Sequence, residues 1–318
     1  MGKFYPFHNG HKYLIERALA ESDELTIVVC DKEQQRISGE ERAKWIREEV
    51  PRAKVIIAPD FLPDDDSAGW AGYIKWLLHE PPDVVFTSED YGELFSKFLG
   101  CRHISVDKER RTIPVSGTKI RKNPLENWEH LPPAVRGRFA KRICILGAES
   151  TGTTTLAEDL AKNYQTVWVQ EFGRMYSESK LKLHSQTWRT EEFVFIAEMQ
   201  NRMEDELAKV CNKILICDTD SFATTLWHER YMGFVSSAVD ALSVGRDYSL
   251  YILTGDEISF VQDGTRDGEY IRHAMHKRFE EELARRGKKY ITVRGSREER
   301  MRAAIAACDE ILEEIEAF

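Results

Sequence analysis

The sequence has no long hydrophobic run and no excess of basic residues. None of its apolar stretches approaches the ~20 residues that cross a bilayer, and the first residues do not form the apolar core of a signal peptide. Lys and Arg total 45 against 54 Asp and Glu, a formal net charge of -9, whereas a nucleic-acid backbone is bound by a basic surface. These absences predict a cytoplasmic protein that binds neither membranes nor nucleic acid.

Cysteine is also scarce, and no two cysteines form a CxxC pair. Three of the six, Cys30, Cys144 and Cys217, lie inside apolar, strand-like runs. A buried free thiol is the ordinary interpretation of a cysteine in such a run. We therefore expect neither a disulfide framework nor a structural metal site.

Short apolar runs alternate with amphipathic helical stretches along the whole chain. At 318 residues, 42% hydrophobic and 31% charged, the chain fits two domains of ordinary size. The proline-rich stretch 122–138 interrupts the alternation and predicts the domains 1–138 and 139–318. Each is predicted to be an α/β domain with a doubly wound parallel sheet and its ligand at the carboxyl ends of the strands. The predicted strands are 25–30, 53–59, 83–88, 101–106, 141–147, 165–171, 213–218, 248–254 and 288–293.

Two segments of the first domain have the composition of a phosphate site. His8, Gly10 and His11 lie where a helix should begin, and a helix N-terminus offers unpaired amides to an anion. An isolated pair of this kind is more often a polar cap or a packed ring. The second segment, VSGTKIR at 115–121, adds two hydroxyl donors and a guanidinium at another predicted helix start, from Ser116, Thr118 and Arg121.

The second domain opens with a strand, a glycine-flanked loop and a helix, the context of a P-loop. Gly147 and Gly152 have the required spacing, and Thr154 can supply a hydroxyl to Mg²⁺. Thr153, however, stands where the pattern has lysine. Asp218 ends a hydrophobic strand, where a carboxylate would orient Mg²⁺ through water or accept a proton from an attacking hydroxyl.

Further candidates in the second domain have ordinary structural alternatives. The stretch 261–272 resembles a kinase lid that closes over the transferring phosphate, but a solvated charged face explains its arginines equally well. A carboxylate at a strand end is just as often a surface residue. The candidates for the lid and the acceptor are Glu171, Asp220, Asp263, Arg266 and Arg272.

The pair HxGH and SxTxxR, in this order within one domain, resembles the signature of the nucleotidyltransferase superfamily. The resemblance implies that His8 and His11 hold the ATP phosphates and stabilise the pentavalent state. It also implies that Ser116, Thr118 and Arg121 clamp the β- and γ-phosphates. In that superfamily no side chain attacks the α-phosphorus of ATP, because a phosphate of the substrate displaces pyrophosphate. The enzyme positions the reactants and neutralises their charge. The implied ATP-binding residues are Lys3, Gly10, Ser116 and Thr118.

Over essentially its whole length the chain resembles the bacterial bifunctional enzymes that join a nicotinamide mononucleotide adenylyltransferase to a ribosylnicotinamide kinase in NAD synthesis and salvage. The resemblance rests on GKFYPFHNGHKYLI, VFTSE, VSGTKIR, GAESTGTTTL, EFGR, CDTD and VQDGTR. It implies ATP as co-substrate, Mg²⁺ held by Thr154 and Asp218, and nicotinamide mononucleotide, ribosylnicotinamide and NAD as further ligands. It also implies that Trp70 stacks on the nicotinamide ring, although Trp70 and Trp76 could each be packing anchors. The implied P-loop residues are Gly147, Gly152, Thr153, Thr154 and Thr155.

The chain departs from this family pattern in three places. Thr153 removes a charge-assisted contact, so a second hypothesis makes the P-loop domain a nucleotide sensor without catalysis. Only Met1 precedes Gly2, where the pattern has a hydrophobic first strand, and its absence is expected to leave two strand edges unpaired. No helix-turn-helix reader domain is present, which disfavours a DNA-binding regulator. The sequence leaves the oligomeric state open, a homo-oligomer included.

Overall fold

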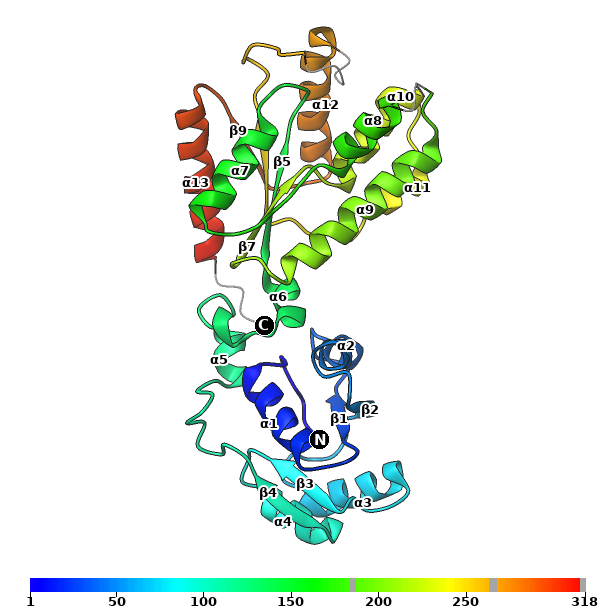
Figure 1. The fold of residues 1–318 in the computed structure, drawn as a ribbon, viewed down its shortest axis with the longest axis vertical. Helices are drawn as coiled ribbons and strands as arrows, with labels where there is room; N and C mark the ends of the chain where they lie inside the picture. Colours follow the sequence, from blue (N-terminus) through cyan, green and yellow to red (C-terminus); the bar gives the residue numbers. More distant parts are fainter. Residues whose placement is uncertain (183–186, 263–267, 315–318) are drawn as a thin grey trace. The chain divides into compact units, whose positions relative to one another are not determined.

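The computed structural model describes residues 1–182, 187–262 and 268–314. These residues form two compact units, Met1–Val135 and a second unit that begins at Arg136 (Figure 1). Both units alternate strands with helices, and every named strand pair is parallel. The predicted α/β class with parallel sheets is confirmed.

The first unit places four short strands among five helices. Its strands form two separate two-stranded sheets, β1 with β2 and β3 with β4. Helix α2 begins at the cap that the sequence indicates, since Ser38 accepts a hydrogen bond from the amide of Glu41. The strands are β1 (Thr26–Asp31), β2 (Lys54–Pro59), β3 (Val84–Thr87) and β4 (Arg102–Ser105). The helices are α1 (Asn9–Ala20), α2 (Gly39–Glu49), α3 (Ser67–Leu78), α4 (Gly92–Leu99) and α5 (Gly117–Lys122).

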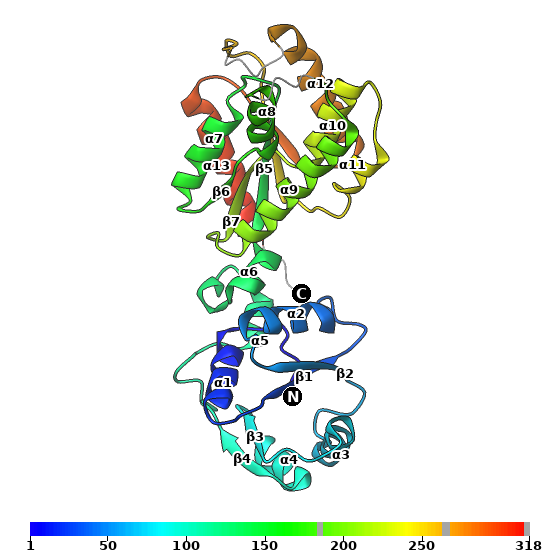
Figure 2. The same ribbon diagram turned by 45° about the vertical axis from the view of Figure 1, so that its right-hand side comes forward.

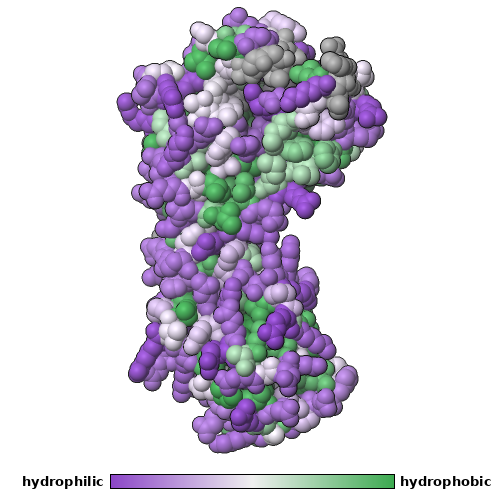
Figure 3. All heavy atoms as spheres, in the orientation of Figure 1, coloured by the Kyte–Doolittle hydropathy of each residue, from purple (hydrophilic) through white to green (hydrophobic). Residues whose placement is uncertain are grey.

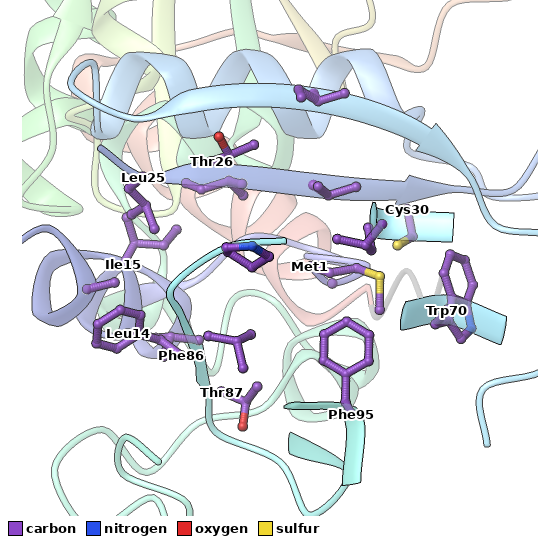
Figure 4. Close-up of a pocket in the computed structure, with 18 of the residues that line it drawn as sticks. Met1, Leu14, Ile15, Leu25, Thr26, Cys30, Trp70, Phe86, Thr87 and Phe95 are labelled. Atoms are coloured by element: carbon purple, nitrogen blue, oxygen red, sulfur yellow. The ribbon is translucent and has the colours of Figure 1, made fainter. Parts of the chain in front are cut away.

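A cavity of about 1740 Å³ lies between the two sheets of this unit (Figure 4). Side chains of β1 and β3 line it, among them Val28 and Phe86. On the other side of β1 from β2, the N-terminal segment bonds to the strand through Gly2. The Gly2 amide donates to the carbonyl of Val28, and the Gly2 carbonyl accepts from the amide of Cys30. Within the described residues, neither β1 nor β3 pairs with a strand on the edge that faces the other. The two sheets therefore stay separate because their facing edges are unpaired.

An added strand ahead of Met1 is expected to stabilise this unit. The Gly2 bonds are those of a parallel strand, so residues before Met1 would continue along β1 and fill the cavity. Five apolar, β-branched residues should raise the Tm of the first unit by ~5 °C or more in calorimetry. A Gly-Ser extension of equal length is the control, and an equal shift from it would contradict the prediction.

The second unit is built on one five-stranded parallel sheet with the order β6-β7-β5-β8-β9. The P-loop follows β5, the first of these strands in the chain, which is central in the sheet. The strands are β5 (Lys141–Leu146), β6 (Trp168–Val169), β7 (Ile214–Asp218), β8 (Leu250–Thr254) and β9 (Tyr290–Val293). The helices are α6 (Pro133–Phe139, which reaches across the boundary), α7 (Thr153–Asn163), α8 (Phe172–Lys182), α9 (Thr190–Ala208), α10 (Ser221–Met232), α11 (Ser237–Ala241), α12 (Arg272–Arg285) and α13 (Arg297–Glu313).

The central strands of this sheet are buried on both faces (Figure 2). Ile143 and Ile145 of β5 pack with α7 and α13, whereas Cys144 and Leu146 pack with α10 and α12. Successive side chains of a strand point to opposite faces, so a strand covered on both sides is apolar throughout. This covering leaves the carboxyl ends of the strands as the edge of the sheet at which a ligand can bind.

The surface is mainly hydrophilic on the face that Figure 3 shows, with apolar residues gathered in small areas. Among the residues that the structure describes, no helix has both the length and the apolar character needed to cross a membrane.

Candidate functional site

The first site begins where helix α1 begins. His8 caps this helix, and its Nδ1 accepts a hydrogen bond from the amide of His11 at 3.3 Å. Nδ1 therefore carries no proton, and in the neutral ring the proton lies on Nε2. The rings of His8 and His11 stack with centroids 3.7 Å apart. The capping bond and the stack fix both imidazoles relative to the helix N-terminus.

Both imidazoles are neutral at physiological pH. Burial lowers the pKa of His8 to about 3, and the charges of Arg110 and His130 act in the same direction. Burial also lowers the pKa of His11 well below its usual value, with smaller effects from His8 and Arg110. Nδ1 of His11 is buried and has no hydrogen-bond partner in the described chain. An unsatisfied buried polar atom costs ~1–3 kcal/mol, so this nitrogen is available to a ligand.

The low pKa of His8 makes the first unit sensitive to acid. His8 stays neutral when folded but takes up a proton on unfolding below pH ~6.5. Stability should therefore fall as the pH falls from 6.5 toward 3, by ~2 kcal/mol at pH 5. Denaturant unfolding of the first unit at several pH values measures this loss. His8→Asn keeps the helix cap and should weaken the dependence of stability on pH. His79→Asn, at an exposed position, is the control and should leave that dependence as it is in the parent. Equal slopes of stability against pH in the parent and both variants would refute the role of His8.

The second motif of this unit packs against the segment that leads into the first. A Cβ on Gly117 would lie 2.7 Å from the carbonyl oxygen of Tyr5, and one on Gly10 would lie 3.5 Å from Val115. Arg121 donates to the Tyr5 carbonyl at 2.5 Å and to the Thr118 hydroxyl at 3.0 Å. These close approaches bring HxGH and SxTxxR together although about a hundred residues separate them. Ser116 caps α5 through the amide of Lys119 at 3.3 Å.

A buried arginine holds the segment that carries Lys3. Arg42 has no exposed surface and donates to the carbonyls of Lys3 and Cys30 and to Asp31. Its guanidinium also lies over the Tyr5 ring, 5.6 Å from the centroid. Arg42 thereby ties the segment before HxGH to the carboxyl end of β1.

Two lysines flank a buried carboxylate at the ends of β1 and β2. Nζ of Lys3 lies 3.8 Å from Oδ2 of Asp60 and donates to Asp64, and Nζ of Lys32 lies 3.6 Å from the same Asp60 oxygen. The Asp60 side chain is 1% exposed, and neither of its oxygens has a hydrogen-bond partner among the described residues. Both lysine side chains are 40% exposed. The carboxylate of Asp60 therefore holds the ammonium groups of Lys3 and Lys32 near each other, at the edge of the sheet where a phosphorylated ligand would bind.

Trp70 lies in the apolar core beside the cavity rather than at the surface (Figure 4). It is 5% exposed, and its indole N–H donates to the carbonyl of Pro63 at 3.0 Å. The aromatic ring that is exposed here is Phe61, 61% exposed, which directly follows Asp60 and lies 6.1 Å from Trp70 between centroids. The stacking role of Trp70 stays a prediction, and Phe61 offers a second stacking surface.

The second site is the loop between β5 and α7. A Cβ on Gly147 would lie 2.1 Å from Oγ1 of Thr254 and 2.3 Å from Oγ1 of Thr151, so only glycine fits. Gly152 has a φ of 82°, a conformation that favours glycine. The loop leads directly into the N-terminus of α7, where its amides can face an anion. Thr155 is exposed on the first turn of α7.

The hydroxyl of Thr154 in the P-loop and the carboxylate of Asp218 at the end of β7 are in direct contact. Oγ1 of Thr154 donates to Oδ2 of Asp218 at 2.6 Å. Burial raises the pKa of Asp218 to about 6, against the lowering effect of hydrogen bonds from Thr154 and Thr153 and of the charge of Arg174. A hydroxyl and a carboxylate side by side are oxygen donors suited to Mg²⁺.

The other candidates of this unit lie in four different settings. Asp220 caps α10 through the amide of Ala223 at 2.8 Å and accepts from the Tyr251 hydroxyl at 2.9 Å, so both of its oxygens serve the fold. Glu171 lies just after β6, with its Oε2 3.8 Å from Arg174. Arg272 is buried and donates to the carbonyl of Ile258. Asp263 and Arg266 lie outside the described residues.

Several residues of these sites carried no signal in the sequence. Nothing in their sequence neighbours distinguishes them from ordinary surface residues, and only the tertiary structure brings them near the two sites. They are Lys32, Arg42, Asp60, Phe61, Arg110 and Arg300.

Comparison with known proteins identifies the family of this chain. A family model described as "AAA domain" matches residues 142–300, and one described as "Citrate lyase ligase C-terminal domain" matches residues 3–59. The trifunctional NAD biosynthesis/regulator protein NadR of Escherichia coli is 31% identical over 287 residues, which cover 83% of this chain and 70% of that protein. The chain belongs to the NadR family.

Other relatives resemble one unit or share the whole fold. The nicotinamide-nucleotide adenylyltransferase of Methanococcus maripaludis is 31% identical over 144 residues, 42% of this chain and 81% of that protein. A crystal structure of NadR protein in complex with NR has a TM-score of 0.78 at 22% identity and covers 99% of this chain and 97% of that one. The predicted family is confirmed, and the fold of the NadR family extends over both units.

Proposed function

We propose that the first unit transfers the adenylyl group of ATP to nicotinamide mononucleotide, forming NAD and pyrophosphate. The observation that carries this proposal is the packing of the segments that carry HxGH and SxTxxR, in which Gly10 approaches Val115 and both Gly117 and Arg121 contact Tyr5. Relatives named nicotinamide-nucleotide adenylyltransferase match about half of the chain, which supports the choice of acceptor. The second unit phosphorylates ribosylnicotinamide to the mononucleotide that the first unit consumes.

The first reaction needs positioning and charge rather than a nucleophilic side chain. An oxygen of the mononucleotide phosphate forms a bond to the α-phosphorus of ATP, and the bond from that phosphorus to the bridging oxygen of pyrophosphate breaks. Neutral His8 and His11 donate hydrogen bonds to the phosphate oxygens on which charge develops. Lys3 and Arg121 neutralise the leaving pyrophosphate.

The second unit holds a matching set for phosphoryl transfer. Amides of the loop from Gly147 to Thr154 face the nucleotide phosphates. Within the described ranges no cluster of three or more His, Cys, Asp or Glu residues could hold a metal ion. The Thr154 hydroxyl and Asp218 carboxylate nevertheless fit Mg²⁺, which keeps several waters and takes substrate phosphates as ligands. Bound there, the ion would neutralise the phosphates, while Asp218 orients the acceptor hydroxyl.

A paired assay tests both activities in the intact chain. The chain is incubated with ATP and Mg²⁺, with nicotinamide mononucleotide in one reaction and ribosylnicotinamide in the other, and products are separated by chromatography. NAD should form in both reactions, with the mononucleotide as an intermediate in the second. NAD from the mononucleotide alone would contradict the kinase assignment and leave the second unit a nucleotide sensor. Mononucleotide without NAD in the second reaction would contradict the adenylyltransferase assignment alone. No mononucleotide formed in the second reaction and no NAD in either would contradict both assignments.

A further inference from the structure

The P-loop of this chain lacks its own lysine, yet a cationic side chain supports it from another element. Arg300 belongs to α13, whereas the loop precedes α7, and the two contact each other across 149 residues. The side chain of Arg300 is 7% exposed. A charge this well buried persists only where its hydrogen bonds are satisfied by the fold.

Arg300 hydrogen-bonds to the loops that follow three neighbouring strands. Its Nη1 donates to the carbonyl of Thr151 at 2.7 Å, after β5. Its Nη2 donates to the carbonyl of Gly255 at 3.2 Å, after β8, and its Nε donates to the carbonyl of Gly295 at 3.0 Å, after β9. Oε1 of Glu257 accepts a further bond from Nη2 at 2.7 Å. One guanidinium therefore sets the P-loop relative to the two adjacent strand ends.

The bond to Thr151 bears directly on phosphate binding. In a trans peptide the carbonyl and the following amide N–H point in opposite directions. Because the Thr151 carbonyl points toward Arg300, the amide of Gly152 points away from it. Nη1 also lies 4.0 Å from the place where a Cβ on Gly152 would be, so the positive charge sits against the loop backbone.

We propose that Arg300 is the positioning residue that compensates for Thr153. It holds the P-loop amides in their phosphate-binding arrangement and supplies from α13 the positive charge that the loop itself lacks. The proposal rests on the kinase half of the proposed function, since it assigns a residue to the nucleotide phosphates of that site. Arg300 acts through the loop and is not assigned a contact with the transferring phosphate.

The test is a mutant cycle between positions 300 and 153 in the full chain. Arg300→Met, Thr153→Lys and the double variant are compared with the parent for the Kd of Mg-ATP by calorimetry and for kcat and KM with ribosylnicotinamide. Arg300→Met should raise the Kd of ATP ~10-fold or more, and Thr153→Lys should restore most of that loss in the double variant. Arg297→Met is the matched control, because Arg297 lies on the same helix, 65% exposed and paired with Asp159, and its Kd should not change.

Two results would overturn the proposal. One is an unchanged ATP affinity in Arg300→Met. The other is a double variant that binds ATP as weakly as Arg300→Met, because a lysine in the loop could not compensate for the loss of a purely structural arginine. If Arg300→Met does not fold, Arg300→Lys is measured instead, because a single ammonium group cannot make all four hydrogen bonds. A Kd of ATP that is raised ~3-fold in Arg300→Lys and restored by Thr153→Lys supports the proposal. An unchanged Kd in Arg300→Lys refutes it.

The ATP titration also separates this proposal from the kinase assignment. It contains no acceptor, so it reports ATP binding without phosphoryl transfer. The ATP site of the first unit is the same in every variant of the cycle, so a difference between variants reports on the P-loop. A parent chain that binds ATP but does not phosphorylate ribosylnicotinamide would contradict the acceptor assignment, while the Kd values of the cycle would still decide the role of Arg300.

Discussion

Replacing His11 by alanine should lower NAD formation from nicotinamide mononucleotide and ATP by ~10²-fold or more, the effect of losing one preorganised donor. Its ring stacks on His8, and the buried Nδ1 has unused hydrogen-bonding capacity among the described residues. A neutral donor held at the mouth of α1 interacts most strongly when charge develops on the phosphate oxygens. The rate is measured at saturating ATP, with product followed by chromatography.

Controls distinguish this loss from simple destabilisation of the unit. Ile15→Ala removes buried surface from the same helix, one turn later, without touching the imidazoles, and should retain most activity. His11→Asn retains an N–H donor and should fall between alanine and the parent. Phosphorylation of ribosylnicotinamide should be unchanged in His11→Ala. Loss of both activities with unchanged circular dichroism would contradict two independent sites.

Replacing Asp218 by asparagine should lower ribosylnicotinamide phosphorylation by ~10²-fold or more and leave adenylyl transfer unchanged. Asparagine fills the same space at the end of β7 but removes the negative charge beside Thr154. That charge is what would balance a divalent cation and attract the proton of an acceptor hydroxyl. Single-turnover kinetics with excess enzyme measure the chemical step directly.

The neighbouring Asp220 provides a matched control. Both of its oxygens accept bonds from the fold, and asparagine is an equally good N-cap. Asp220→Asn should therefore change stability but keep kcat within ~3-fold. Equal losses in the two variants would show that Asp220 also takes part in the reaction. An active Asp218→Asn would contradict the assignment of the site.

Most strands follow the predicted runs because the central residues of most runs are apolar or β-branched. The segment 165–171 is the exception, since only Trp168–Val169 pairs as β6. Gln165 has a φ of 50°, and the amide of Thr166 donates back to Ala161, so the start of this run closes helix α7 instead. Local hydrogen bonds of this kind do not show in hydrophobic periodicity. The predicted boundary between residues 138 and 139 lies close to the division at Val135, within α6.

The candidate residues differ in how far short motifs could identify them. HxGH, SxTxxR and the P-loop can be recognised from residues that are close in the sequence, because each motif places its phosphate-binding groups on one short segment of backbone. Asp218 was found because a carboxylate follows an apolar strand. Asp220 has the same local pattern but caps α10, and only its contacts with Ala223 and Tyr251 distinguish the two.

The α/β class, the NadR family and the order of the two sites follow from the sequence alone, because strand periodicity and phosphate-binding motifs are local patterns. The tertiary structure decided which residues support those motifs. Arg300 reaches the P-loop from the last helix, Arg42 holds Lys3 from α2, and Trp70 is enclosed beside the cavity. Such contacts join residues far apart in the chain, and the burial that gives each contact its strength arises only when the elements pack.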